Sequence, residues 1–367
     1  MKFVCDGLVL SDAAITVSKA CATKTIKPVM ECVKLSAEND VLTLLAYDGE
    51  ISIEKKIPVE VMEEGEICVN GKLFSDFINK VSSFSLVIGT CDKGLEIRYA
   101  DSESYMQTLP AVDFPLVKND VAGSAYFEVK EADLKELISK AVFCCATEDS
   151  RPILKGCLLE TEGETLHATA LDGYRMAVSE CPAVGASGEV KIVCPARTLT
   201  EISRMLEGGE NNLKIRVGKN AIELTVGDTA LTSRLYMGEF VKRENIFPPA
   251  FTTVVTVNRA EFINSVERAL VLIRGDKNNL ILLEIKPDLI RITANSEIGN
   301  VSETVNGELE GKELKIAMNG KFLLDALKAL TEEKTILSFN TPISPFTLAN
   351  VEDKTSEYLV LPVRTNS

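Results

Sequence analysis

The sequence predicts an α+β protein built from three repeated units, each with two helices packed on antiparallel β-sheet. Two observations lead to this fold class. Three landmarks recur along the chain at one spacing, which is typical of a repeated architecture. Within a unit, two stretches with helical periodicity separate short segments in which apolar and polar residues alternate as in β-strands. The chain has 367 residues, enough for two or three domains.

The repeat rests on a turn after an apolar run, the start of the second helix, and a pair of residues near the end of each unit. The turns are Asp48-Gly49, Asp172-Gly173 and Asn295-Ser296, which are 124 and 123 residues apart. The helix starts are Val69 to Lys72, Cys194 to Arg197 and Met318 to Lys321, at offsets of 125 and 124. The closing pairs are Leu109-Pro110, Leu235-Tyr236 and Leu361-Pro362, spaced by 126 twice. We therefore expect domains over residues 1–120, 125–249 and 252–367.

Periodicity assigns the elements of the first unit in order. A short strand over Lys2 to Cys5 precedes a helical stretch containing Leu8, Ile15 and Val17. A second helix is expected over residues 72–81, where apolar residues recur at helical spacing. The remaining strands are expected at Cys32 to Leu35, Val41 to Ala46, Ile51 to Pro58, Leu86 to Gly89, Leu95 to Tyr99 and Tyr105 to Leu109.

The composition is that of an ordinary folded protein. The chain carries 40 Lys plus Arg against 54 Asp plus Glu, a formal charge of -14, and 46% hydrophobic residues. This mixture excludes collagen-like, disordered and coiled-coil classes. No run approaches the ~18 apolar residues of a membrane helix, and Asp6 and Asp12 come too early for a secretory signal. We expect a cytoplasmic protein with no membrane partner.

The sequence predicts no metal site, no cofactor site and no active site. The ten cysteines form no C-x-x-C pair, and His167 is the only histidine, so we expect small core thiols and no zinc. Gly71-Lys72 and Gly320-Lys321 lack the upstream glycine of a phosphate-binding loop. His167 lies in an alternating, strand-like run and is more simply a structural residue than a general base.

The second helix of every unit carries two cations despite the acidic total. The pairs are Lys72 and Lys80, Arg197 and Arg204, and Lys321 and Lys328. In the last two units the members are seven residues apart, which is two turns and one helix face. Lys19, Lys140 and Arg268 occupy matching places in the first helices. These cations form either a solvated face or a basic stripe that faces a polyanion.

Several motifs spread over the chain resemble those of the bacterial DNA polymerase sliding clamp family, the β subunits of the replicative polymerase. They are Met1-Lys2-Phe3, Thr108 to Pro115, Glu160 to Gly163, Leu171 to Val178, and Tyr358 to Arg364, in the family's order. The resemblance implies the DNA-clamp fold, in which one chain forms half of a six-domain ring with helices lining the hole. It also implies a non-catalytic processivity factor that encircles duplex DNA.

The resemblance gives the repeated cations a purpose, because Lys and Arg attract phosphates without reading bases. Sliding requires loose contacts, for which the hydrated lysine side chain is well suited. The DNA-facing residues are then Lys24, Lys72, Lys80, Arg151, Arg197, Arg204, Lys321 and Lys328. The implied partners are duplex DNA without sequence preference, a second copy of the chain, the polymerase catalytic subunit, a clamp loader and other proteins with clamp-binding peptides.

The resemblance further implies a hydrophobic pocket for partner peptides. Matched residue by residue, it comprises Leu154, Leu171, Gly173, Tyr174, Arg175, Met176, Val241, Ile246, Phe322, Ser344, Leu359, Leu361 and Val363. Arg175 is expected to hold the polar end of the peptide. After Phe240, where many members have Pro followed by an acidic and an aromatic residue, this chain reads Val241-Lys242-Arg243.

The resemblance also implies that the ring closes where the first unit of one chain meets the third unit of the other. The expected interface residues are Leu73, Phe77, Met106, Val271 and Leu272. Two alternatives stay open. One is a repeat-built, non-catalytic binding module that does not encircle DNA. The other is an enzyme that uses Cys144 or Cys145 as a nucleophile.

Overall fold

The computed structural model describes residues 1–117, 121, 125–242, 246–275, 278–297 and 299–364. Its helices are α1 (Gly7–Ser18), α2 (Gly71–Lys80), α3 (Glu131–Ala141), α4 (Ala196–Met205), α5 (Arg259–Leu272) and α6 (Gly320–Ala329). Short 3-10 helices lie at Pro28–Glu31, Ala111–Asp113, Val142–Cys144 and Pro152–Lys155. Among these residues, no helix is long and apolar enough to cross a membrane.

Contacts divide the chain into two compact units. The first comprises residues 1–129, 204–207 and 211–235, and the second comprises 130–203, 208–210 and 236–367. The middle of the three expected ranges is thus shared between the units. The reason is strand pairing, since Thr229–Arg234 (β19) continues a sheet of the first unit through Ile51–Pro58 (β4).

The first unit contains two sheets. The smaller has the order β5-β1-β7-β8-β9, with β1 (Lys2–Asp6), β5 (Glu60–Glu63), β7 (Ser85–Cys91), β8 (Gly94–Tyr99) and β9 (Ser102–Met106). The larger sheet has the order β10-β6-β2-β3-β4-β19-β18-β17, and β11 (Ala125–Lys130) lies next to β17. Its strands not yet introduced are β10 (Thr108–Leu109), β6 (Gly65–Asn70), β2 (Cys32–Glu38), β3 (Val41–Tyr47), β18 (Ala221–Val226) and β17 (Asn212–Val217). Strand β1 pairs antiparallel with β5 and β7, as do β2 with β3 and β6, and β4 with β19.

The second unit is organised by one sheet of the order β16-β12-β13-β14-β27-β26-β25-β20-β23-β22-β21-β24. Its strands from the middle third are β12 (Gly156–Glu162), β13 (Thr165–Leu171), β14 (Arg175–Pro182) and β16 (Lys191–Pro195). Those from the last third are β20 (Thr253–Asn258), β21 (Leu280–Lys286), β22 (Leu289–Ser296), β23 (Gly299–Gly311), β24 (Leu314–Asn319), β25 (Lys334–Phe339), β26 (Phe346–Asn350) and β27 (Ser356–Val360). The short strand β15 (Val184–Ser187) follows β14 in the chain.

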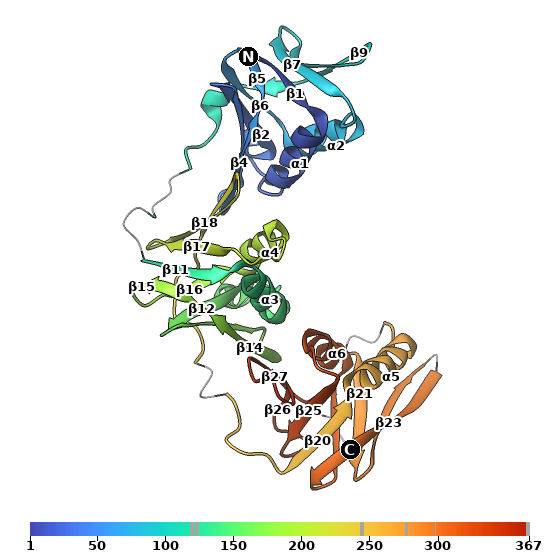
Figure 1. Cartoon of the computed structure of the whole chain (residues 1–367). Helices are drawn as coiled ribbons and strands as arrows, with labels where there is room; N and C mark the ends of the chain where they lie inside the picture. Colours follow the sequence, from blue (N-terminus) through green and yellow to red (C-terminus); the bar gives the residue numbers. More distant parts are fainter. Residues whose placement is uncertain (118–120, 122–124, 243–245, 276–277, 298, 365–367) are drawn as a thin grey trace. The chain divides into compact units, whose positions relative to one another are not determined.

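Two pairs of helices pack against the sheets. Helices α1 and α2 pack on each other, as do α5 and α6 (Figure 1). Small residues allow this close approach in α1, where Ala13, Ala14 and Val17 are fully buried. Helices α2 and α6 begin at equivalent asparagines: Asn70 accepts a hydrogen bond from Leu73 N at 3.0 Å, and Asn319 accepts one from Lys321 N at 2.9 Å. The Asn-Gly-Lys landmark is therefore a helix cap.

The predicted α+β class and the antiparallel character of the sheets are confirmed. The helix expected over 72–81 is found at Gly71–Lys80, and the expected strands of the first unit are present with bounds shifted by up to three residues. One expected strand is divided, because the stretch 105–109 contributes to β9 and β10 with a break at Gln107. The short strands β5 and β6 were not expected from the sequence.

Candidate functional site

The most distinctive site in the second unit is the junction between β14, from the middle third, and β27, from the last third. The two strands pair antiparallel, with Met176 opposite Leu359 and Val178 opposite Glu357. Since side chains alternate along a strand, Met176, Val178 and Leu359 lie on one face of the sheet. Two distant segments of the chain thus form a single continuous surface.

An apolar cluster, hereafter the junction cluster, lies on this face. Its buried members are Leu154, Leu171, Met176 and Leu359. Partly buried apolar side chains pack against them: Ala146, Ile153, Val178, Phe240, Ile246, Phe247 and Leu361. Six predicted pocket residues, Leu154, Leu171, Met176, Ile246, Leu359 and Leu361, are therefore brought together from segments far apart in the sequence.

A tight turn at Asp172 sets one rim of the cluster. The Asp172 carboxylate accepts hydrogen bonds from Tyr174 N at 2.9 Å and Arg175 N at 3.0 Å. Gly173 has φ +95°, a backbone conformation that residues with a side chain rarely adopt. The turn leaves Tyr174 64% exposed, with its ring stacked on that of Phe322 at a centroid distance of 6.2 Å. The Asp172-Gly173 landmark of the second repeat thus presents the aromatic side chain of Tyr174.

Arg175 connects the two halves of the junction. Its guanidinium donates to Asp172 Oδ2 at 2.9 Å, to Asp325 Oδ2 on α6 at 2.7 Å, and to the carbonyl of Phe143 at 2.8 Å. It also lies over the rings of Phe143 and Phe322. All three nitrogens of Arg175 donate within the chain, which gives the side chain a structural role. Its expected contact with the polar end of a peptide stays a prediction.

The other predicted pocket residues lie outside the junction cluster. Ser344 pairs its hydroxyl with Thr341 at 2.6 Å, and the amide of Val363 donates to the carbonyl of Ala317 at 2.8 Å. Val241 is exposed and lines a separate hollow beyond Phe240. The sequence interpretation missed Ala146, Ile153, Val178, Phe240 and Phe247. Of these, Val178 carried a usable signal, since it follows Met176 at the spacing of one strand face.

The eight predicted DNA-facing cations are all exposed. Lys72 and Lys80 lie in the first and last turns of α2, Arg197 and Arg204 in those of α4, and Lys321 and Lys328 in those of α6. Lys24 follows α1, and Arg151 immediately precedes the 3-10 helix at Pro152–Lys155. Lys328 also forms an ion pair of 2.6 Å with Glu267 on α5, so part of its charge is compensated within the helix pair.

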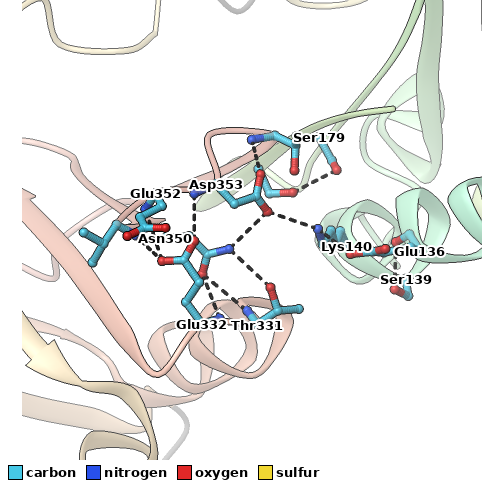
Figure 2. Close-up of polar contacts among 12 residues, drawn as sticks. Glu136, Ser139, Lys140, Ser179, Thr331, Glu332, Asn350, Glu352 and Asp353 are labelled. Carbon is cyan, nitrogen blue, oxygen red and sulfur yellow. Dashed lines mark hydrogen bonds and ion pairs between the residues drawn. The ribbon is translucent and has the colours of Figure 1, made fainter. Parts of the chain in front are cut away.

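One cation of the first helices departs from the expected exposed face. Lys140 on α3 is only 6% exposed, and its ammonium lies 2.6 Å from Glu136 and 3.8 Å from Asp353 (Figure 2). The expectation that the matching cations of the first helices form a solvated face or a basic stripe is therefore wrong for Lys140. The reason is tertiary: Asp353, in the loop between β26 and β27, supplies a distant carboxylate.

That loop is held by a network of polar contacts from its own third of the chain (Figure 2). The Glu332 carboxylate accepts hydrogen bonds from the backbone amides of Val351, Glu352 and Asp353 at 2.9, 3.1 and 2.7 Å. These bonds lower the pKa of Glu332. Asn350 donates to Asp353 Oδ2 at 3.3 Å. The network fixes the segment that leads into β27 and so helps to position the junction cluster.

The predicted interface residues differ in exposure. Leu73 on α2 and Val271 on α5 are 54% and 57% exposed, unusually high for large aliphatic side chains on helices. Phe77 and Leu272 are partly buried. Met106 is 5% exposed and belongs to the core of the first unit, although its strand, β9, lies at the edge of the five-stranded sheet. Leu73 and Val271 are thus the members that a second chain could reach.

The cysteines have the properties of core residues. None of the ten, all of which lie in the described ranges, forms a disulfide, and eight of them are buried. Burial is the main cause that raises the pKa of the Cys144 and Cys145 thiols, so both are protonated at neutral pH and poor nucleophiles. The described residues contain no group of three or more His, Cys, Asp or Glu that could hold a metal ion.

Comparison with known families extends over nearly the whole chain. Models of the N-terminal, central and C-terminal domains of the DNA polymerase III beta subunit match residues 1–118, 128–242 and 244–364. The chain is 32% identical to the beta sliding clamp of Halalkalibacterium halodurans over 380 residues, covering 100% of both chains. It is 30% identical to the beta sliding clamp of Bacillus subtilis over 378 residues, again covering 100% of both.

Solved structures agree. The crystal structure of the DNA polymerase sliding clamp from Bacillus subtilis is similar with a TM-score of 0.94 and 29% identity, covering 100% of this chain and 99% of that one. A sliding clamp from Pseudomonas aeruginosa, solved bound to griselimycin, is similar with a TM-score of 0.92 and 28% identity, covering 100% of both chains. The structural likeness therefore covers the complete architecture.

Proposed function

Because the chain belongs to the DNA polymerase III beta subunit family, we propose that it is the processivity factor of a replicative DNA polymerase. Two copies form a ring in the cytoplasm that encircles duplex DNA and tethers the polymerase to its template. The observation that carries this proposal is the similarity to proteins named beta sliding clamp over the full length of both chains. The role is mechanical, and no residue is required to make or break a bond.

The DNA-facing surface is formed by the cations of α2, α4 and α6, together with Lys24 and Arg151. Exposed Lys and Arg attract phosphates through screened Coulomb forces and counterion release, without reading the bases. Four of the six helix cations are lysines, whose flexible, hydrated ammonium groups can exchange one phosphate for the next. The acidic total of -14 disfavours DNA elsewhere on the molecule. Topology rather than affinity then keeps the ring on DNA.

The junction cluster is the site at which partner proteins are held. One or two Leu or Phe anchors of a partner peptide would gain roughly 1.5 to 3 kcal/mol each by burial against apolar side chains. Tyr174, exposed at the rim, adds an aromatic contact. The same cluster serves the polymerase, a clamp loader and other proteins with clamp-binding peptides, because it recognises short apolar anchors instead of a folded surface.

The ring closes where the first unit of one chain meets the last third of its partner. The contact buries apolar surface of Leu73 and Phe77 on one chain and of Val271 and Leu272 on the other. Edge strands such as β9 pair across the contact, which satisfies their free backbone groups. The contact is head to tail, and it stops at two copies when the angle closes.

Retention on DNA of different topology tests the proposal. The protein is loaded onto closed circular DNA by a clamp loader with ATP, the complex is separated by gel filtration, and its mass is measured by light scattering. We expect a dimer that stays on the closed circle and is lost when the circle is cut once. Equal retention on circular and linear DNA would indicate ordinary affinity and contradict a ring.

A further inference from the structure

The sheet face under the junction cluster continues into a polar region. On β13, Thr169 lies two residues before Leu171, so both side chains lie on the same face. Thr169 pairs with Val178 on β14 and with Leu158 on β12. Two residues beyond Leu158, Glu160 pairs with Lys191 on β16. The floor of the junction cluster therefore extends without a break toward a pair of charged residues.

A hollow of about 250 Å³ lies over this extension. Its floor is formed by Leu158, Thr169, Glu160 and Lys191, and its wall by the segment Phe240 to Lys242. Phe240 also packs against the junction cluster. Phe240 thus belongs to both the junction cluster and the wall of the hollow, so a peptide that leaves the cluster past Phe240 enters the hollow.

The charges of the hollow favour an anion. Lys191 forms an ion pair with Glu160, which neutralises the carboxylate of the floor. Lys242 is exposed, and no ion pair or hydrogen bond of its ammonium is found within the described part of the chain. Of the two lining cations, Lys242 is therefore the one without a partner among the described residues, and it lies next to the exposed side chain of Val241.

We propose that this hollow is a second peptide subsite, which receives an acidic residue next to the apolar anchors of a partner peptide. The carboxylate pairs with Lys242, while its methylene groups pack on Val241 and Phe240. The inference rests on the proposed peptide-binding function of the junction cluster and adds a preference for acidic flanks. Such a preference selects among partners with equally good anchors.

Three synthetic peptides with one Leu-Phe anchor pair test the subsite: a neutral one, one with Glu before the anchors and one with Glu after them. Their affinities for the full chain are measured by fluorescence polarisation. We expect one of the two acidic peptides to bind about two- to five-fold more tightly than the neutral one, the range of a solvent-exposed ion pair. The gain should decrease as ionic strength rises.

Charge reversal provides the decisive comparison. In Lys242→Glu the favoured acidic peptide should lose its advantage, and the same peptide with Lys in place of Glu should gain one. Lys312→Glu, on the exposed turn after β23, is the matched control and should leave all affinities unchanged. Equal binding of neutral and acidic peptides by the unmodified chain would overturn the subsite and leave the proposed function intact. Failure of every peptide to bind would count against the proposed function itself.

Discussion

At the scale of single residues, Arg175, which the resemblance assigns to peptide binding, also makes structural contacts within the chain. Its three hydrogen bonds join the turn at Asp172, the carbonyl of Phe143 and Asp325 on α6. The side chain is 12% exposed, and the partner carboxylates are 15% and 30% exposed. Such a partly buried network is costly to break because the carboxylates would remain without a counter-charge.

We therefore predict that Arg175→Met lowers the free energy of unfolding by about 2 to 4 kcal/mol. Arg175→Lys should recover only a part, since an ammonium cannot reproduce the planar fork of three donors. Urea unfolding followed by circular dichroism measures both. If Arg175→Met loses peptide affinity at unchanged stability, then Arg175 contacts the peptide directly and the structural assignment is incorrect.

Glu332 gives a pH dependence of known sign. Three backbone amides donate to its carboxylate and lower its pKa from the ordinary value of 4.5. A group whose pKa is lower in the folded state contributes stability above its unfolded pKa, and this contribution is lost as the pH falls through the folded value. The loop that leads into β27 should therefore weaken as the pH falls below about 4.5.

The prediction is tested by comparing the chain with Glu332→Gln between pH 7 and pH 3. The variant should be less stable at neutral pH, and its stability should decrease less on acidification, because the amide no longer titrates. Glu313→Gln is a suitable control, because the Glu313 carboxylate has no hydrogen bond or ion pair among the described residues. Parallel pH profiles for Glu332→Gln and the unmodified chain would show that the carboxylate does not contribute through its charge.

At the scale of elements, the helix faces carry the DNA hypothesis. We predict that replacing Lys80, Arg204 and Lys328 together by Gln slows loading or sliding on circular DNA while the fold is kept, because three phosphate contacts are removed. Gln is preferable to Glu at position 328, since Glu267 lies 2.6 Å from the native ammonium. A control triple variant, Lys56→Gln, Lys286→Gln and Lys312→Gln, removes the same charge from strands and a turn. If the two triple variants behave equally on circular DNA, the helix cations form only a solvated face and do not contact DNA.

Elements are also the scale at which the sequence predicted most. Periodicity located the helix at Gly71–Lys80 and most strands of the first unit because apolar spacing reflects local burial. It could not predict the environment of Lys140, since Glu136 lies one turn away but Asp353 is contributed by a distant loop. The short strand β5, exposed along most of its length, carried too few apolar residues to be recognised.

The junction cluster shows the same limit. Leu171, Met176 and Leu359 were identified by resemblance to a family motif, whereas Phe240 and Phe247 were missed. Both belong to an irregular segment without periodicity, so only the folded chain reveals their packing. Val241, which the resemblance assigned to the pocket, lines the hollow together with Phe240.

At the scale of the whole molecule, the ring requires two chains, and the exposed aliphatic residues Leu73 on α2 and Val271 on α5 are proposed to lie in the interface between them. Leu73 is 54% exposed and Val271 57% exposed, so neither contributes much to the stability of its own unit. A charge placed there should spare the fold and oppose assembly, since burying an unpaired carboxylate in an interface is unfavourable. Assembly and folding can therefore be separated by mutation.

We predict that Leu73→Glu yields a monomer that unfolds like the unmodified chain and binds anchor peptides with unchanged affinity, yet is no longer retained on closed circular DNA. Val184→Glu, at a side chain that is also 54% exposed but lies on β15, is the matched control and should remain dimeric and retained. Light scattering gives the molar mass, and gel filtration with circular DNA gives retention. A Leu73→Glu protein that keeps the dimer mass would remove α2 from the interface, whereas a monomer still retained on the circle would show that encirclement is not what holds the protein on DNA.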